Sequence, residues 1–465
     1  MIKQDIINKL SFAAGVILVY AISFMLRVNF IVPTLLFSLF LYYRLPHKRP
    51  SVKGPSLLAL SLLFMIIFSL TYFITKNNLP DLYIPFALVP MLSMILFCQS
   101  ETSLLLVLVT SAVIGALAGY DYFLAMLSMI SGISAVLLVK DVRRRGSVIK
   151  AGFIVGVIQA ATLFFIDYYT VINPVRYAVI LANGIICGVA VIGVLPIFEY
   201  LFKTVTNISL LELADFNHPL LQRMILEAPG TYHHSLVVGN LSEAACRAVG
   251  AHALLARVGA YYHDIGKLSK PDYFSENQGI NISRHDNLAP SMSKLIIMNH
   301  VKEGTDLARR YKLNPALLDF IDSHHGNSLV YYFYRRALEG LEEDQTIREE
   351  GFRYPGPKPR TKETAIVLLA DSVEAATRAL KEPDPEKIKE VVHKIINNKF
   401  IDGQLDECEL TLKDLENISA VFIHILGGIY HTRVNYPEDK KSEDNNKKPA
   451  KESPSPTGKD KKSNP

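Results

Sequence analysis

The chain has 465 residues, which is more than one ordinary domain, and 50% of them are hydrophobic. The net charge of +5 is small and is explained by a few basic loops and a lysine-rich end, so it does not indicate binding to nucleic acid. The four cysteines are scattered without a CxxC spacing, which predicts a reducing compartment and no disulfide framework.

The apolar residues concentrate in the first 200 positions. Apolar runs of roughly 15 to 22 residues recur there, and each is about long enough to cross a bilayer as a helix. Residues 1–202 are therefore predicted to form a polytopic transmembrane domain of about eight helices, with seven as the alternative. The predicted spans lie near residues 9–26, 29–43, 56–75, 80–98, 103–119, 121–139, 151–169 and 177–202.

Two basic loops predict the orientation. The loop Arg44–Lys53 has four basic residues and no acidic one, and the loop Lys140–Lys150 has five basic residues against Asp141. Both loops should face the cytoplasm, because positive charge accumulates on that side of a membrane. With eight spans, the chain returns to the cytoplasm after Phe202, so the C-terminal half is predicted to be cytoplasmic.

The remaining chain reads as helical. Residues 203–229 have helical apolar spacing broken by Asn217-His218-Pro219, which predicts a connector. Residues 230–436 show little strand-like alternation and residues 437–465 have almost nothing to bury, so we expect an all-α domain and a disordered charged tail. The helices predicted in the domain are Ser235–Val249, His252–His263, Ala289–His300, Thr305–Tyr311, Pro315–His324, Leu329–Leu338, Lys362–Leu380, Pro385–Asn397 and Thr411–Arg433.

The dipeptide His263-Asp264 is the centre of a set of potential metal ligands. Further candidates lie at or beside the predicted helix ends: His234, His300, His324, His325 and Asp371. Imidazoles and carboxylates in this number exceed the needs of one tetrahedral metal and suit two octahedral metals that share a carboxylate. Any one of these histidines alone would more often be a capping or surface residue, so the prediction depends on the whole set.

Two metals would supply what phosphodiester hydrolysis needs. They lower the pKa of a water molecule and neutralise the phosphate oxygens. Asp264 is the predicted bridging ligand and, with Lys267, the predicted catalytic residue. Adjacent side chains on a helix point about 100° apart, so the metals would lie along the seam between the His263 and Asp264 faces. Lys267, one helical turn further on, is expected to reach a phosphate oxygen.

Two further segments are candidate substrate contacts. His285, in the second His-Asp dipeptide, either contacts a nucleotide or caps the helix that follows. The loop Tyr354–Arg360 carries Lys358 and either closes over an anionic substrate or is simply solvated. The predicted substrate-binding residues are therefore Lys267, His285 and Lys358.

Five stretches carry a family resemblance. Glu227–Ser235, Gly259–Lys267, Ser323–Gly326, Tyr354–Pro359 and Leu369–Ala375 resemble the membrane-bound PgpH-type cyclic di-AMP phosphodiesterases of the HD superfamily. The resemblance implies a multi-pass enzyme of the bacterial inner membrane. It would hydrolyse cyclic di-AMP to 5′-pApA through a metal-bridging hydroxide between two divalent ions, Mn²⁺ or Fe²⁺, and it leaves a homodimer open.

The resemblance also implies how the ligands divide. One metal would take His234, His263, Asp264 and Asp371, and the other Asp264, His300, His324 and His325. Two departures from the family pattern are visible. Only Arg27-Val28-Asn29 stands where the family usually has a large extracytoplasmic domain, and Ile282-Ser283-Arg284-His285-Asp286 replaces the usual Asn-Pro-His-Asp.

Three alternatives remain. A cyclic di-GMP phosphodiesterase of the HD-GYP type would follow the paired histidines with a glutamate and a Gly-Tyr-Pro segment, whereas this chain has Gly326-Asn327-Ser328. A nucleoside phosphate hydrolase is rarely joined to so many membrane spans. A receptor or transporter whose domain only binds nucleotide would be favoured by a missing ligand, and the sequence lacks none.

Overall fold

The structure is a computed structural model, and it describes residues 57–167, 173–202, 204–278, 284–339, 347–381 and 383–430. The first two predicted spans, the loop Arg44–Lys53 and the predicted tail 437–465 lie outside these residues. Within them the chain is helical and forms no strand, with one isolated bridge between Leu329 and Arg353. The all-α prediction is confirmed.

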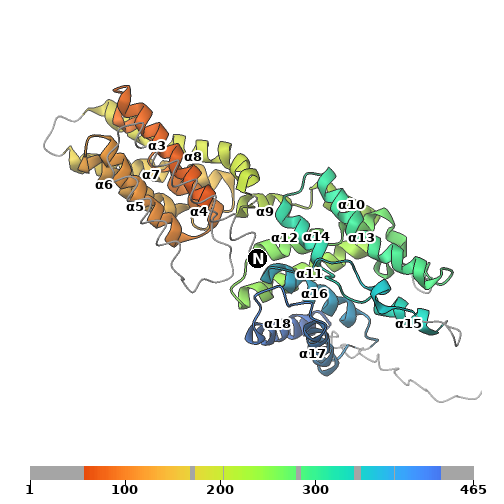
Figure 1. Cartoon of the computed structure of the whole chain (residues 1–465). Helices are drawn as coiled ribbons and strands as arrows, with labels where there is room; N and C mark the ends of the chain where they lie inside the picture. Colours follow the sequence, from red (N-terminus) through yellow and green to blue (C-terminus); the bar gives the residue numbers. More distant parts are fainter. Residues whose placement is uncertain are drawn as a thin grey trace, which may run out of the picture.

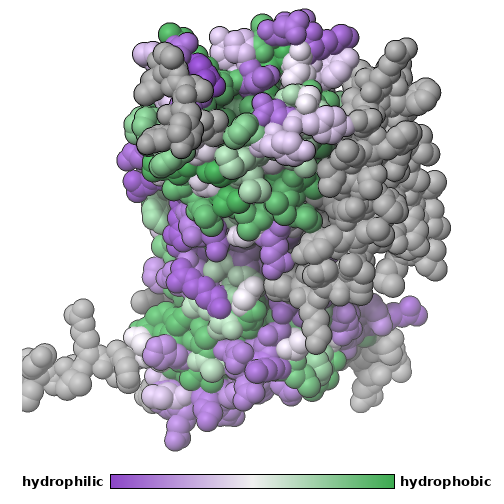
Figure 2. Space-filling model, turned by 90° about the vertical axis from the view of Figure 1, so that its left-hand side faces the viewer, coloured by the Kyte–Doolittle hydropathy of each residue, from purple (hydrophilic) through white to green (hydrophobic). Residues whose placement is uncertain are grey.

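Among the described residues, five helices are long and apolar enough to cross a membrane. Figure 2 shows a hydrophobic band across the upper body of the molecule, bordered above and below by hydrophilic surface. Large apolar side chains such as Phe165, which is 77% exposed, stand on the outside of these helices. Such a surface suits lipid rather than water. The five helices are α3 (Leu57–Lys76), α5 (Ser100–Leu117), α6 (Tyr122–Val139), α7 (Arg145–Ile166) and α8 (Pro174–Phe202).

The predicted span 80–98 is wrong as a single helix. The chain forms a short 3₁₀ helix, η1 (Asp81–Tyr83), and then α4 (Leu88–Phe97). Proline has no N–H to donate, so Pro85 stays outside the helix, while Pro90 is tolerated in its first turn. Ten residues extend about 15 Å, half of the hydrocarbon thickness of a bilayer. All ten are buried, so α4 packs inside the bundle.

Helices α7 and α8 approach each other closely through glycines. A Cβ atom added to Gly184 would overlap the carbonyl oxygen of Gly152, and one added to Gly156 would overlap that of Leu181. Small residues at such contacts let the backbones of two membrane helices touch.

The second half forms a separate helical body beside the membrane helices (Figure 1). The predicted break between His300 and Thr305 is wrong, because one continuous helix covers both segments. A single glycine inside a helix costs only about 1 kcal/mol, and Gly304 here makes room for the backbone of Gly266. The helices are α11 (Pro229–Ala248), α12 (Ala253–Tyr262), α13 (Pro290–Arg310), α14 (Pro315–Ser323), α15 (Tyr331–Glu339), α16 (Lys362–Arg378), α17 (Pro385–Ile401) and α18 (Leu412–Tyr430).

Short 3₁₀ helices join these elements. They are η2 (Ile265–Ser269), η3 (Pro271–Tyr273), η4 (Ser275–Asn277) and η5 (Glu349–Phe352).

The predicted connector forms two helices, α9 (Asn207–Leu213) and α10 (Pro219–Glu227), of which α9 lies between the two bodies (Figure 1). On the membrane side, Glu199 of α8 accepts hydrogen bonds from the backbone N–H of Thr206 and the hydroxyl of Ser209, both at 2.8 Å. On the other side, the Tyr262 hydroxyl donates to the carbonyl oxygen of Leu213 at 2.7 Å. The connector thus touches α12 at the residue that precedes His263.

Candidate metal centre

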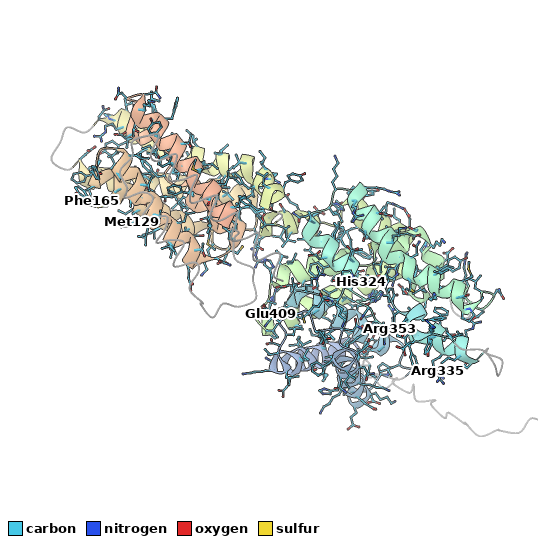
Figure 3. The ribbon with its side chains drawn as sticks, viewed as in Figure 1. Met129, Phe165, His324, Arg335, Arg353 and Glu409 are labelled. Atoms are coloured by element: carbon cyan, nitrogen blue, oxygen red, sulfur yellow. The ribbon has the colours of Figure 1, made fainter. Side chains whose placement is uncertain are left out.

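Five helices contribute the side chains of the centre. His234 stands on α11, His300 on α13 and Asp371 on α16, while the other candidates follow the last residues of α12 and α14. His324 lies inside the helical domain, whereas Arg335 on α15 lies at its outer end (Figure 3). The structure brings all seven predicted ligands into two groups, each with its ligand atoms within 4.8 Å of one another. The groups are His234, His263, Asp264 and Asp371, and His300, His324 and His325.

Asp264 lies between the two groups. Its Oδ2 atom is 3.2 Å from His263 Nε2 and 3.6 Å from His234 Nε2. Its Oδ1 atom is 3.3 Å from His300 Nε2 and 3.5 Å from His324 Nε2. One carboxylate therefore turns one oxygen to each group.

The local backbone explains how the two neighbours His263 and Asp264 both reach the centre. Helix α12 ends at Tyr262, and Asp264 has φ −109° and ψ 16°, outside the helical region. The expectation that both side chains stand on a regular helix is therefore wrong. Leaving the helix at Asp264 removes the fixed angle between the side chains, so they converge on one point.

Hydrogen bonds orient the imidazoles. The Nδ1 atoms of His263 and His324 donate to the carbonyl oxygens of Ala260 at 2.6 Å and Ile321 at 2.8 Å, and His300 Nδ1 donates to that of Ile297. Because a carbonyl oxygen only accepts, Nδ1 of each ring carries a proton, so Nε2 is the ring atom that faces the centre and would bind a metal once it is unprotonated.

Within the described part of the chain, several buried nitrogen and oxygen atoms of the centre lack hydrogen-bond partners, as expected of atoms that bind cations. His300 Nε2 and His324 Nε2 face each other at 3.1 Å, although both are lone-pair acceptors when Nδ1 carries the proton. Among the described residues, no hydrogen-bond partner exists for the buried atoms His234 Nε2, His263 Nε2 and Asp264 Oδ1. Buried polar atoms rarely lack partners, and neutral imidazole with carboxylate is a donor set that divalent metals bind.

The electrostatics of the centre favour ionised carboxylates. Burial works against charge, but His263 and Lys267 outweigh it and hold the pKa of Asp264 well below its ordinary value. Burial also opposes charge on His263, yet the Asp264 carboxylate raises the pKa of that imidazole to about 10, so a metal ion that bound at its Nε2 atom would have to displace a proton. In the second group burial dominates and lowers the pKa of His300 to about 3, so this imidazole is a neutral donor at pH 7.

Lys267 contacts the bridging carboxylate. Its Nζ atom is 2.8 Å from Asp264 Oδ2 and 2.6 Å from Glu276 Oε1. Burial opposes charge on Glu276, but Lys267 lowers the pKa of its carboxyl to about 2. Two carboxylates thus neutralise Lys267. The sequence analysis missed Glu276, because only the 3₁₀ turns η2 to η4 bring it back to the centre.

Glu374 is a second residue that the sequence analysis did not single out. Its Oε2 atom accepts from His234 Nδ1 at 2.5 Å, and both side chains are buried. The bond fixes the ring of His234 in the way a carboxylate fixes a metal-binding imidazole. The signal was present in the sequence, since Glu374 lies three residues after Asp371 and therefore on the same face of α16.

The other two predicted substrate contacts have partners elsewhere. His285 is buried, its Nε2 atom lies 2.8 Å from the carbonyl oxygen of Tyr273, and its ring packs against Phe333. Lys358 Nζ lies 3.3 Å from a carboxylate oxygen of Asp406. Neither side chain belongs to the two ligand groups found among the described residues.

Apolar helices long enough to cross a membrane, joined to a buried His/Asp centre on helices, define a membrane protein with an HD-type domain. The family model described as "7TM receptor with intracellular HD hydrolase" matches residues 22–206, and the model of the HD domain matches residues 231–376. The chain belongs to this family of membrane proteins with an HD domain. An HD domain implies divalent metal binding, and the two ligand groups are where a metal would be held.

Two of the similar proteins carry the same name. The chain is 45% identical over 331 residues to the Bacillus subtilis cyclic-di-AMP phosphodiesterase PgpH. This match covers 70% of this chain and 46% of the relative. It is 37% identical over 421 residues to PgpH of Listeria monocytogenes, covering 86% of this chain and 57% of the relative. The chain thus spans about half the length of these relatives.

A crystal structure of the L. monocytogenes PgpH HD domain in complex with cyclic di-AMP is also similar. The identity is 45%, the match covers 47% of this chain and 100% of that chain, and the TM-score is 0.44.

Proposed function

We propose that the protein is a metal-dependent phosphodiesterase that hydrolyses cyclic di-AMP to 5′-pApA. The observation that carries the proposal is Asp264, whose two carboxylate oxygens each face one group of imidazoles. A carboxylate shared between two ligand groups would hold two metal ions close together, as in two-metal hydrolases of phosphate esters. The substrate is proposed from the relatives, which are named cyclic-di-AMP phosphodiesterases.

The ligand sets follow the two groups. We assign one ion to His234, His263, Asp264 and Asp371, and the other to Asp264, His300, His324 and His325. When bound, two divalent cations lower the pKa of water and neutralise the oxygens of a phosphodiester. Mn²⁺ and Fe²⁺ suit a mixed imidazole and carboxylate donor set.

Hydrogen bonds and an ion pair within the protein hold the ligands of the centre in place. The Nδ1 hydrogen bonds of His263 and His324 to backbone carbonyls hold their Nε2 atoms toward the centre. Lys267 contacts Oδ2 of Asp264 and keeps this carboxylate ionised and fixed, which we propose as its catalytic role. The oxygen of water bonds to phosphorus while the bond to one 3′-oxygen breaks. A proton from the water ends on that 3′-oxygen as a hydroxyl group, which leaves a linear dinucleotide with a 5′-phosphate.

The membrane location supports a signalling enzyme. The described loop between α6 and α7 contains Lys140, Arg143 and Arg144 against one acidic residue, Asp141, and positive loops face the cytoplasm. Helix α9 leads directly from α8 of the membrane body into the HD domain. We therefore propose that the HD domain faces the cytoplasm of a bacterial cell, where its nucleotide substrate is available.

The test is hydrolysis by the purified full-length chain in detergent. We expect the protein loaded with Mn²⁺ to convert cyclic di-AMP to 5′-pApA and to prefer it over cyclic di-GMP and cyclic GMP-AMP. Asp264→Ala should abolish turnover, while Glu390→Ala, which removes an exposed carboxylate on α17 of the same domain, should leave it unchanged. Faster turnover of cyclic di-GMP would overturn the substrate, and an active Asp264→Ala protein would overturn the mechanism.

A further inference from the structure

Lys399, in the last turn of α17, points toward the segment that follows the paired histidines. Its Nζ atom donates a hydrogen bond to the hydroxyl oxygen of Ser328 at 2.7 Å. Ser328 is buried, and its backbone N–H donates to the carbonyl oxygen of His325 at 3.0 Å. One turn of backbone therefore separates the ammonium group of Lys399 from a residue of the centre.

Lys399 differs from the other lysines around the centre because it has no carboxylate partner among the residues that the structure describes. Lys358 and Lys362 each contact one carboxylate, and Lys267 contacts two. The nearby carboxylate of Asp402 is engaged by Arg353, at 2.8 and 3.3 Å.

Burial lowers the pKa of the Lys399 ammonium, and the fields of Asp371 and Asp402 oppose this shift without contact. An anion that bound beside Lys399 would stabilise the protonated ammonium group, because a nearby opposite charge favours the charged form of a side chain.

Lys399 also lies near the most exposed ligand of the centre, His325. The His325 side chain is 21% exposed and that of Asp371 is 10% exposed, whereas the side chains of His263 and His324 are fully buried. His325 is thus the most exposed of the seven ligands, so its side of the centre is the most accessible one. Ser328 lies three residues beyond His325, and the field of Asp371 reaches Lys399.

Tyr354 contacts both His325 and the segment that carries Ser328. Its ring stacks on His325 with centroids 4.3 Å apart, and its backbone N–H donates to the Ser328 carbonyl oxygen at 3.0 Å. Arg353, labelled in Figure 3, donates to the carbonyl oxygen of Asn327 at 3.0 Å and holds the same segment. The hydroxyl partner of Lys399 thus sits on a rigid edge beside the ligands.

We propose that Lys399 binds the phosphate of the substrate that is not being hydrolysed. This inference rests on the proposed function, because a cyclic dinucleotide carries two phosphodiesters in one ring. The partner of Lys399, Ser328, lies three residues beyond the ligand His325, so an anion bound by Lys399 would lie beside the scissile phosphate rather than on the ligands. Lys267, neutralised by two carboxylates, is less suited to attract this second charge.

The test compares two substrates in the full-length protein loaded with Mn²⁺. Cyclic di-AMP has two phosphates, whereas bis(p-nitrophenyl) phosphate has only one. For Lys399→Met we expect KM for cyclic di-AMP to rise about tenfold or more, as the loss of a charge-assisted hydrogen bond implies. Its kcat should stay within about twofold, because the lost contact is equal in the ground and transition states. Turnover of bis(p-nitrophenyl) phosphate should not change.

Matched variants separate binding from structure. Ser328→Ala removes the hydroxyl partner but keeps the charge, so it should leave KM for cyclic di-AMP close to that of the wild type, and Lys399→Arg should retain most of the affinity. An unchanged KM in Lys399→Met, or an equal rise in Ser328→Ala, would overturn the role of Lys399. An equal loss of turnover of both substrates in Lys399→Met would also overturn it. Absence of cyclic di-AMP hydrolysis by the wild type would instead overturn the proposed function itself.

Discussion

The hydrogen bond between Glu374 and His234 leads to the most specific prediction about the centre. Replacing Glu374 by alanine leaves the Nδ1–H group of a buried imidazole without an acceptor. A buried donor without a partner costs about 1 to 3 kcal/mol. Loss of a group that orients a metal-binding imidazole weakens metal affinity by about 10- to 100-fold, which is about 1.4 to 2.7 kcal/mol.

We therefore expect Glu374→Ala to need at least about tenfold more Mn²⁺ for half-maximal activity. Glu374→Gln should need less Mn²⁺ than Glu374→Ala, because the amide oxygen of glutamine still accepts a hydrogen bond from His234 Nδ1. The assay is a titration of the chelator-stripped protein with Mn²⁺, read by phosphodiesterase activity and by metal binding to the protein. Glu390→Ala, which removes an exposed carboxylate on α17, is the control. Equal Mn²⁺ affinity in Glu374→Ala and the control would refute the orienting role.

Two further predictions concern stability and pH. A Cβ atom at Gly266 would overlap the carbonyl oxygen of His300, so Gly266→Ala should destabilise the HD domain by about 1 to 3 kcal/mol. Thermal unfolding should show this loss, whereas Gly351→Ala, where nothing lies within 4 Å, should melt like the wild type. The Lys267 contact depresses the pKa of Glu276 from 4.5 to about 2, so the stabilisation is present above pH 4.5 and is lost as the pH falls toward 2. Melting temperatures of Glu276→Gln should depend less on pH in that range, and an unchanged dependence would contradict the pair.

The ligand set could be predicted from the sequence because it depends on residue types that have few other uses in such numbers. His263-Asp264 and the later His324-His325 pair are adjacent in the chain, and Asp371 stands in a recognisable stretch. The apolar spacing also indicates that these residues lie at or beside the ends of helices, where several helices can bring their ligands to one point. The geometry at Asp264 could not be predicted, because the apolar spacing does not show that the backbone departs from the helical conformation at this residue.

The residues that support the centre could not be predicted so well. The spacing from Asp371 places Glu374 on the same face of α16, but its partner His234 is 140 positions away. The partner of Lys399 is 71 positions away, so only the packed fold shows these two contacts. The same limit explains the wrong span at 80–98. Hydropathy detects that a segment is apolar, but it does not distinguish a helix that crosses the membrane from the short buried helix α4.

The central claim is that one carboxylate, Asp264, joins two metal ions into a single hydrolytic centre. Mass-spectrometric metal analysis of the active, full-length protein after Mn²⁺ loading and removal of excess metal tests it most directly. We predict two ions per chain in the wild type and fewer than one in Asp264→Ala, because both sites lose their shared ligand. One ion per chain in a fully active wild type, or two in Asp264→Ala, would contradict the account.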